Sequence, residues 1–471
     1  MRIFEILLFI FTGLTLVLVF PLKGIHKKFQ IIAAGASVLA LIGHVLIEKT
    51  RWQMIPVIVI TILLVLFVVV HYLREKTEKP AKLPRWAWIL AIVFLIVALL
   101  PPILFPVPAL PDPTGPYAVG TTSFDWVDEN REETLSPASA GKRHLMVQVW
   151  YPAEMDAKAQ LAPYMEKMDI TGPVLARQLH LPSFLFDHIG LAKTHSYLNV
   201  PISSGESRYP VLIFSHGWTG VRTQNTYQAE DLASHGYIVI APDHTYGAGI
   251  VVFQDGSVVF NNPKLIPDDS VNQSEYDRVV RVLGQAWVGD LRFALNQAEL
   301  LNSGDIPSIF AGKLDLDRVG FFGHSTGGGA VIETCALDER CKAGLSEDAW
   351  MIPYSREMLE TGVKQPFFFM QSENWSSQRN TTFFNTLFTY IQPPAYKLAI
   401  KGAGHYDFSD IPLLTPLATA IGLKGPINSQ RGLSIVNTYT LAFFDQTLKG
   451  IPSPLLEGQS TNYPETVLTQ K

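Results

Sequence analysis

Hydrophobic residues fill the N-terminal part of the chain in four long runs. These runs cover residues 3–22, 29–47, 54–72 and 86–105. Each run is close to the roughly 20 residues that a helix needs to cross about 30 Å of hydrocarbon. Tryptophan and tyrosine lie at several run ends, where amphipathic rings favour the headgroup layer of a bilayer. The pattern therefore predicts a membrane domain of four transmembrane helices at residues 1–106.

The lysines and arginines between the runs predict how the helices cross the membrane, because positive charges near helix ends are retained on the cytoplasmic side. They concentrate in the loops after the first and third runs, at Lys23, Lys27, Lys28, Arg74, Lys76, Lys79, Lys82 and Arg85. The N-terminus and the second loop carry fewer, namely Arg2, Lys49 and Arg51. We therefore expect a multi-pass protein of the cell membrane with residues 107–471 as an extracytoplasmic domain.

The pattern changes beyond residue 146 to short β-branched or aromatic runs separated by helical stretches. Strands are predicted at residues 146–151, 211–215, 237–241, 319–323, 343–346, 367–371 and 396–400, and helices at 223–234, 274–301, 327–337 and 433–448. Such alternation is typical of an α/β domain with a mostly parallel sheet flanked by helices. Residues 163–198 fit neither pattern, and we expect them to lie over the edge of the sheet.

The amino-acid composition argues against several classes of protein function. The chain has 471 residues, of which 48% are hydrophobic and 17% charged, so it can bury large cores. Residues 107–471 are acidic and lack a basic stripe, which argues against nucleic-acid binding. Metal-binding motifs such as H-E-x-x-H are absent from the sequence, and no metal or other cofactor is expected. Cys335 and Cys341 either pair outside the cytoplasm or stay as buried thiols.

One short motif predicts the chemistry. A predicted strand at residues 318–322 runs into the pentapeptide Gly-His-Ser-Thr-Gly at 323–327, and a predicted helix follows. The pattern G-x-S-x-G between a strand and a helix is the nucleophile elbow of the α/β-hydrolase fold, where a sharp turn exposes a serine hydroxyl above the sheet. We therefore interpret Ser325 as a nucleophile and the outer domain as an α/β-hydrolase.

A serine nucleophile needs a base to take its proton and an acid to orient that base. In this fold the three residues follow in the order serine, acid, histidine. His405 is the one histidine C-terminal to Ser325 and is the predicted base. Two acids compete for the third position, since Glu373 follows the strand after next and Asp348 follows the strand directly after the elbow helix.

The oxyanion formed during ester cleavage needs backbone N–H donors. One donor is predicted at Thr326, the residue after the nucleophile. The other is predicted at Trp218, in the glycine-rich turn that follows the strand at residues 211–215. His216 precedes this donor, and we interpret it as a residue that holds the turn by a hydrogen bond.

At these residues the chain resembles the plasma-type platelet-activating-factor acetylhydrolase family. The matching segments occur in order: FSHG at 214–217, DLASHG at 231–236, FGHSTGG at 322–328, DAW at 348–350, QPFFFMQSE at 365–373 and Gly-His at 404–405. The resemblance implies that Asp348 is the acid and Trp218 an oxyanion donor. The membrane helices have no counterpart in secreted members, and Trp218, Thr219 and Thr326 replace the family's more usual residues.

The expected function is that of a membrane-anchored serine carboxylic-ester hydrolase that degrades lipids. The resemblance implies short or oxidised acyl esters of phospholipids as substrates, with the bilayer as a partner and without a cofactor. The elbow also resembles that of cutinases and polyester hydrolases, so such an enzyme or a general carboxylesterase is an alternative. An alternative of another class is a membrane sensor that binds lipid without cleaving it.

Overall fold

The protein is described from a computed structural model, which covers residues 1–19, 27–74, 84–136, 141–155, 158–178, 180–268, 270–373, 375 and 377–471. These residues form two compact units. The helical unit comprises residues 1–108, 172–191 and 414–417, and the sheet unit comprises residues 109–171, 192–413 and 418–471. Two short segments from later in the chain, residues 172–191 and 414–417, thus pack with the N-terminal helices.

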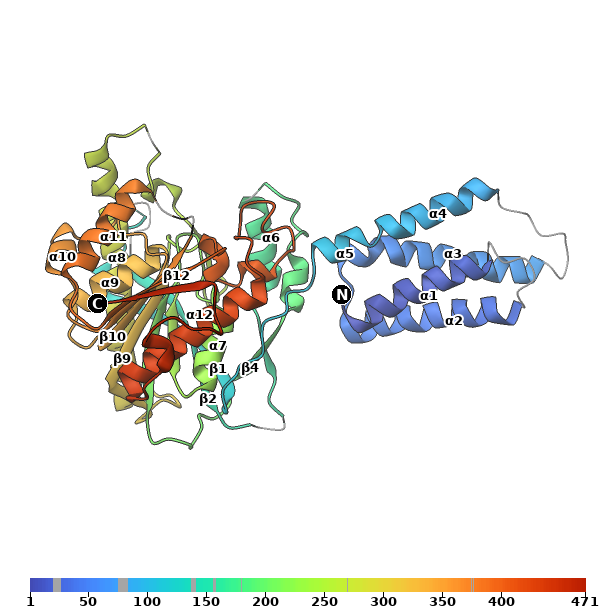
Figure 1. Cartoon of the computed structure of the whole chain (residues 1–471). Helices are drawn as coiled ribbons and strands as arrows, with labels where there is room; N and C mark the ends of the chain where they lie inside the picture. The colour runs from blue at the N-terminus through green and yellow to red at the C-terminus, as the bar shows by residue number, and fades with distance from the viewer. Residues whose placement is uncertain are drawn as a thin grey trace. The chain divides into compact units, whose positions relative to one another are not determined.

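The helical unit is built from antiparallel helices that lie side by side (Figure 1). Their bounds are α1 Ile3–Val19, α2 Lys27–Gly43 with its continuation His44–Glu48, α3 Ile55–Arg74, α4 Arg85–Val97 and α5 Leu100–Leu104. Small hydroxyl residues link the helices, since Thr12 bonds Thr61 at 2.7 Å and Thr15 bonds Ser37 at 3.1 Å between side-chain oxygens. Such interhelical hydrogen bonds hold helices together where the surroundings are apolar.

Among the described residues, three helical spans are long and apolar enough to cross a membrane, namely Lys27–Glu48, Trp52–Leu73 and Trp86–Leu104. The fourth predicted crossing corresponds to α1, which is shorter, with 17 residues; the end of that predicted run lies outside the described residues. Four crossings therefore remain a prediction. Several cations used to predict the orientation, Lys23, Lys76, Lys79 and Lys82, also lie outside the described residues.

One end of the helical unit carries an aromatic cluster. The indole N–H of Trp52 donates to the Leu185 carbonyl at 3.3 Å. Its ring lies 5.6 Å from the ring of Phe105 and 5.4 Å from that of Phe184. The Thr415 hydroxyl donates to the Leu104 carbonyl at 2.7 Å. These contacts explain why residues 172–191 and 414–417 belong to the helical unit. Within the segment 163–198, for which no strand was predicted, residues Lys193–Leu198 instead form strand β4 of the large sheet.

The sheet unit contains an eleven-stranded sheet in the order β13-β12-β11-β10-β9-β5-β6-β2-β1-β4-β3. The strands are β1 Ala118–Glu132, β2 Lys142–Ala153, β3 Leu161–Pro163, β4 Lys193–Leu198, β5 Tyr209–Ser215, β6 Ile238–Pro242, β9 Leu314–His324, β10 Ala343–Glu347, β11 Phe367–Ser372, β12 Ala395–Ile400 and β13 Thr466–Gln470. Strands β6, β5, β9, β10, β11 and β12 are parallel. A two-stranded sheet of β7 Ile250–Val252 and β8 Val258–Phe260 accompanies it.

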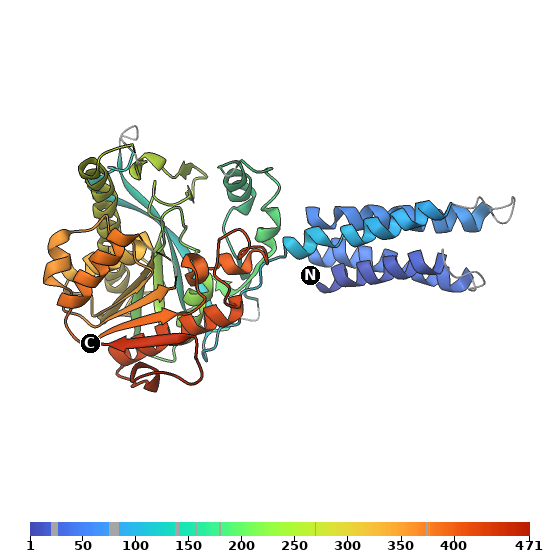
Figure 2. The same ribbon diagram turned by 45° about the horizontal axis from the view of Figure 1, so that its top comes forward.

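Helices cover both faces of the large sheet (Figure 2). One face carries α8 Gln273–Ser303, α9 Thr326–Leu337, α10 Arg356–Thr361 and α11 Gln378–Tyr390, and the other carries α7 Thr226–Ser234 and α12 Ser429–Phe444. Helix α6 is Met168–Gln178. Strands β5 and β6 are buried along their whole length, as expected for parallel strands between two helical layers. The predicted α/β fold is confirmed.

The parallel strands bring their carboxyl ends to one edge of the sheet, where ligands bind in open α/β folds. Cys335, in the last turn of the elbow helix α9, forms a disulfide with Cys341. The bridge closes the turn that leads from α9 to β10. The structure thus decides between the two states that the sequence left open for these cysteines.

Candidate active site

Ser325 lies on a tight turn between β9 and α9. Its backbone φ is 55°, a value that side-chain-bearing residues rarely adopt. The turn is held by backbone hydrogen bonds, since Ser325 N donates to Glu347 O at 2.8 Å and accepts at its own carbonyl from Trp350 N at 2.8 Å. A Cβ added at Gly327 would lie 2.1 Å from the Ser215 carbonyl oxygen. The elbow therefore needs glycine at that position.

The structure brings Asp348 to His405. Asp348 follows β10, and its Oδ2 lies 3.1 Å from His405 Nδ1. The carboxylate also accepts hydrogen bonds from the Ser372 backbone at 2.7 Å and from the Ser372 hydroxyl. Glu373, the competing acid, instead accepts from Gly402 N at 2.8 Å and is exposed.

Burial dominates the electrostatics of this pair. It raises the pKa of Asp348 to about 7, against the opposing effect of the two Ser372 hydrogen bonds. It lowers the pKa of His405 to about 3, which keeps the imidazole neutral at pH 7. Trp375 stacks on the imidazole, with ring centroids 4.1 Å apart. A neutral imidazole carries a proton on one ring nitrogen and has the other nitrogen free to accept one.

The turn after β5 lies against the elbow. A Cβ added at Gly217 would be 3.2 Å from Ser325 Cβ. His216 Nδ1 donates to the Gly217 carbonyl at 2.7 Å, and its Nε2 accepts from His244 N at 3.0 Å. Because the C=O and N–H of a trans peptide point in opposite directions, fixing this carbonyl also fixes the direction of the Trp218 N–H. The interpretation of His216 as a residue that holds the turn agrees with these contacts.

Thr326 occupies the other predicted donor position. It is the first residue of α9, and N–H groups in the first turn of a helix have no acceptor within that helix. The positive end of the helix dipole also favours negative charge at this position. The backbone arrangement is thus compatible with the predicted role.

A second Ser-His-Asp arrangement lies beneath the turn, and sequence reasoning missed it. Ser215 Oγ is 2.8 Å from His244 Nε2, and His244 Nδ1 is 3.0 Å from Asp290 Oδ2. All three residues are fully buried, so no ester can reach the serine. Trp287 stacks on His244 at 4.0 Å. The arrangement therefore packs beneath the turn that follows β5.

Asp290 is the centre of this buried network. Arg143 contacts both of its carboxylate oxygens, at 3.0 and 2.6 Å, and Arg131 contacts one at 2.9 Å. Burial alone would raise the pKa of Asp290, but the guanidinium charges of Arg143 and Arg131 hold it well below its usual range. The carboxylate is therefore ionised and paired.

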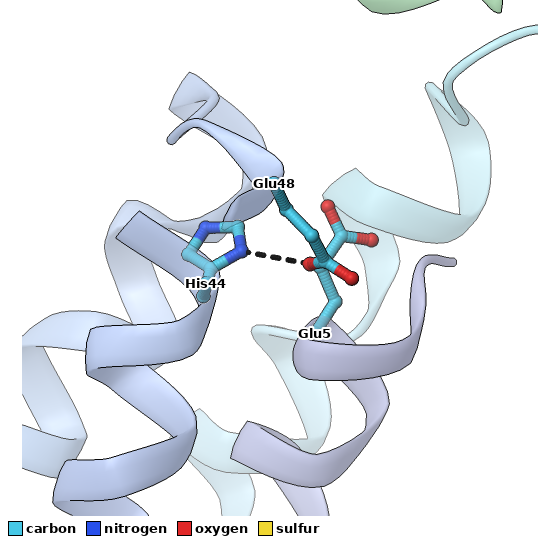
Figure 3. Close-up of side chains that lie close together, drawn as sticks. All are labelled: Glu5, His44 and Glu48. Atoms are coloured by element: carbon cyan, nitrogen blue, oxygen red, sulfur yellow. Dashed lines mark hydrogen bonds and ion pairs between the residues drawn. The ribbon is translucent and has the colours of Figure 1, made fainter. Parts of the chain in front are cut away.

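Among the described residues, Glu5, His44 and Glu48 of the helical unit lie close enough to share a metal ion (Figure 3). His44 Nδ1 is 3.2 Å from Glu48 Oε2. Arg51 Nε lies 2.7 Å from Glu5 Oε1, and Arg2 Nη2 lies 2.9 Å from the same atom. Arg2 Nε also lies 3.9 Å from Glu48 Oε2. Because guanidinium groups already pair with both carboxylates, we assign no metal to this cluster.

The sequence and fold are similar to those of known esterases. The family model described as platelet-activating factor acetylhydrolase, isoform II, matches residues 104–451. The platelet-activating factor acetylhydrolase of Cavia porcellus is 28% identical over 357 residues, which are 72% of this chain and 78% of that protein. A probable 1-alkyl-2-acetylglycerophosphocholine esterase of Arthroderma benhamiae is 31% identical over 279 residues, 55% of this chain and 65% of that protein.

Among solved structures, a ferulic acid esterase from Streptomyces cinnamoneus superposes with a TM-score of 0.64 at 25% sequence identity. The superposition covers 77% of this chain and the whole of the esterase.

Proposed function

Because the chain belongs to the platelet-activating factor acetylhydrolase isoform II family, we propose that it cleaves phospholipid esters with Ser325 as nucleophile, His405 as base and Asp348 as acid. Family membership makes the chain an ester hydrolase. The observation that carries the residue assignment is the contact between His405 Nδ1 and Asp348 Oδ2 at 3.1 Å. It supports Asp348 over Glu373 as the group that orients the base.

The proposed reaction follows from the roles of these groups. Ser325 Oγ attacks the ester carbonyl while His405 Nε2 takes the hydroxyl proton, and Asp348 stabilises the imidazolium that forms. The N–H groups of Trp218 and Thr326 bind the oxyanion. The tetrahedral intermediate collapses to an acyl-enzyme, and the leaving alkoxide receives the proton from His405. Water activated by His405 then releases the carboxylic acid and regenerates Ser325.

The proposed substrate class is a phospholipid with a short or oxidised acyl chain. Two lines support it: the names of the Cavia porcellus relative and of the fungal relative, and the apolar helices that would keep the enzyme beside lipid. The ferulic acid esterase similarity favours a second candidate, a carboxylesterase for soluble aromatic esters.

A hydrolysis panel separates these candidates. Cells that express the full chain are given glycerophosphocholines with acetyl, hexanoyl or palmitoyl at the second position, and methyl ferulate as the aromatic ester. We expect the acetyl phospholipid to be cleaved fastest and the palmitoyl one slowest. A preference for methyl ferulate over every phospholipid would contradict the proposed substrate class and support the aromatic-ester candidate.

The same panel tests the proposed orientation, in which the catalytic residues lie outside the cytoplasm of a multi-pass membrane protein. It rests on the cation distribution and on three spans of suitable length. With a phosphocholine substrate that does not cross the membrane, the rate on intact cells should equal the rate after lysis. Activity that is absent from intact cells and appears only after lysis would contradict the orientation. It would leave the proposed substrate class intact.

A further inference from the structure

Gln224 lies between the oxyanion turn and the nucleophile elbow. Its side-chain Oε1 accepts from Gly217 N at 3.1 Å, and its Nε2 donates to His324 Nδ1 at 3.1 Å. His324 Nε2 in turn donates to the His405 carbonyl at 2.8 Å. One continuous chain of hydrogen bonds therefore joins the turn, the elbow and the loop of the proposed base.

Each hydrogen bond in this chain has a fixed direction. The Gly217 N–H is a donor, so the oxygen of the Gln224 amide faces it and the NH2 group faces His324. His324 must then accept at Nδ1 and carry its proton on Nε2, where it donates to the His405 carbonyl. His324 is 1% exposed, and burial lowers its pKa to about 3. The imidazole is therefore neutral, as this arrangement requires.

The glycines of the turn after β5 pack tightly against the side chains of Gln224 and His324. A Cβ added at Gly217 would lie 3.1 Å from His324 Nδ1, and one at Gly220 would lie 2.1 Å from Gln224 Oε1. The Gln224 backbone carbonyl also accepts from Asp410 N at 2.9 Å, in the loop that follows His405. Gln224 thus touches both loops through different atoms.

We propose that Gln224 and His324 are positioning residues that set the oxyanion turn relative to the loop of His405. The proposal rests on the proposed function, since it assumes that Trp218 and His405 act in ester cleavage. The Gln224–His324 link fixes the Gly217 peptide through its N–H, while His216 fixes the next peptide through the Gly217 carbonyl. The peptide groups before and after Gly217 are both held by hydrogen bonds, so the Trp218 N–H cannot rotate away from the oxyanion.

The first test replaces Gln224 with methionine, which keeps the length of the side chain and removes its hydrogen bonds to Gly217, to His324 and to the neighbouring Asn225 side chain. Removing an oxyanion donor outright costs about 10²–10³ in kcat, so a displaced donor is expected to cost about 10–100-fold with KM nearly unchanged. Gln273→Met, at an exposed position of α8, is the matched control and should leave kcat unchanged. An unchanged kcat in Gln224→Met, or an effect confined to KM, would overturn the proposal.

The second test uses a pH profile, which a merely structural role would not change. In Gln224→Glu the carboxylate still accepts from Gly217 but cannot donate to neutral His324. When the introduced glutamate and His324 together take up one proton, a hydrogen-bond donor is again present between these two side chains. The kcat of Gln224→Glu relative to the unmodified enzyme should therefore rise as the pH falls from 8 to 5.5, whereas the ratio for Gln224→Met should stay flat.

Other titratable groups face His324 and are present in both variants: His405 and Tyr406 at ring-centroid distances of 4.5 and 6.3 Å, the Asp348 carboxylate, and His216 across the turn. The proposal would be contradicted if the kcat of each Gln224 variant, relative to the unmodified enzyme, stayed constant between pH 8 and 5.5. This outcome would count even if Gln224→Met folds poorly. Failure of the proposed function itself is recognised separately, because the unmodified enzyme would then cleave no ester.

Discussion

Asp348→Asn is expected to lower kcat on an acetyl phospholipid about 10⁴-fold with little change in KM, because the imidazole loses the group that selects its tautomer and stabilises its charge. Asparagine keeps the size of the side chain. It also keeps an acceptor for one of the two Ser372 hydrogen bonds. The loss should therefore appear in turnover and not in folding, and steady-state kinetics on the purified full chain measure it.

Glu373→Gln is the matched control for that experiment. Glu373 accepts from Gly402 N and is exposed, and a glutamine oxygen can accept the same hydrogen bond. We expect its kcat to change by less than about tenfold, the size of one ordinary hydrogen bond. The reverse pattern, with Glu373→Gln inactive and Asp348→Asn active, would assign the acid to the later strand.

Asp290→Ala is expected to destabilise the sheet unit by about 3–5 kcal/mol, the cost of breaking a buried ion pair by removing one partner. Arg143, 1% exposed, would lose its partner in two hydrogen bonds, at 3.0 and 2.6 Å. His244 would lose the acceptor for its Nδ1 proton. Urea unfolding of the full chain in detergent, followed by tryptophan fluorescence, measures the change.

Asp277→Ala provides a control on the same helix. Asp277 also pairs with two arginines, Arg379 at 2.5 Å and Arg356 at 3.1 Å, but these pairs lie at the surface. Surface ion pairs contribute about 0–1 kcal/mol, so Asp277→Ala should unfold almost like the unmodified protein. Equal losses for the two aspartate variants would show that burial of the network around Asp290 is not what stabilises it.

The central strands were predictable because burial on both faces gives continuous apolar runs. The runs at residues 211–215 and 367–371 fall within β5 and β11. Strand β1 was missed, since its residues from Ser123 to Glu132 mix acidic and apolar side chains as an exposed strand does. Strand β13 was missed as well, and it pairs with β12 at the sheet edge with a partly exposed pattern.

The proposed nucleophile and base could be assigned from the sequence, because each assignment depends on local sequence and chain order. Spacing alone left two candidates for the acid, and the resemblance to the family was needed to favour Asp348, since the choice depends on which strand end faces His405 in the folded sheet. The position of Asp290 could have indicated a buried charge from the sequence, since it lies between Trp287 and Leu291 on the buried face of α8. No sequence feature could have indicated the role of Gln224, because its contacts to Gly217 and His324 arise from tertiary packing alone.

The central claim, that Ser325 is the nucleophile, is tested most directly by labelling the full chain with a fluorophosphonate and locating the adduct by peptide mass spectrometry. We predict one adduct, on Ser325, and loss of both labelling and acetyl-phospholipid hydrolysis in Ser325→Ala. An adduct on another residue, or continued hydrolysis by Ser325→Ala, would contradict the account.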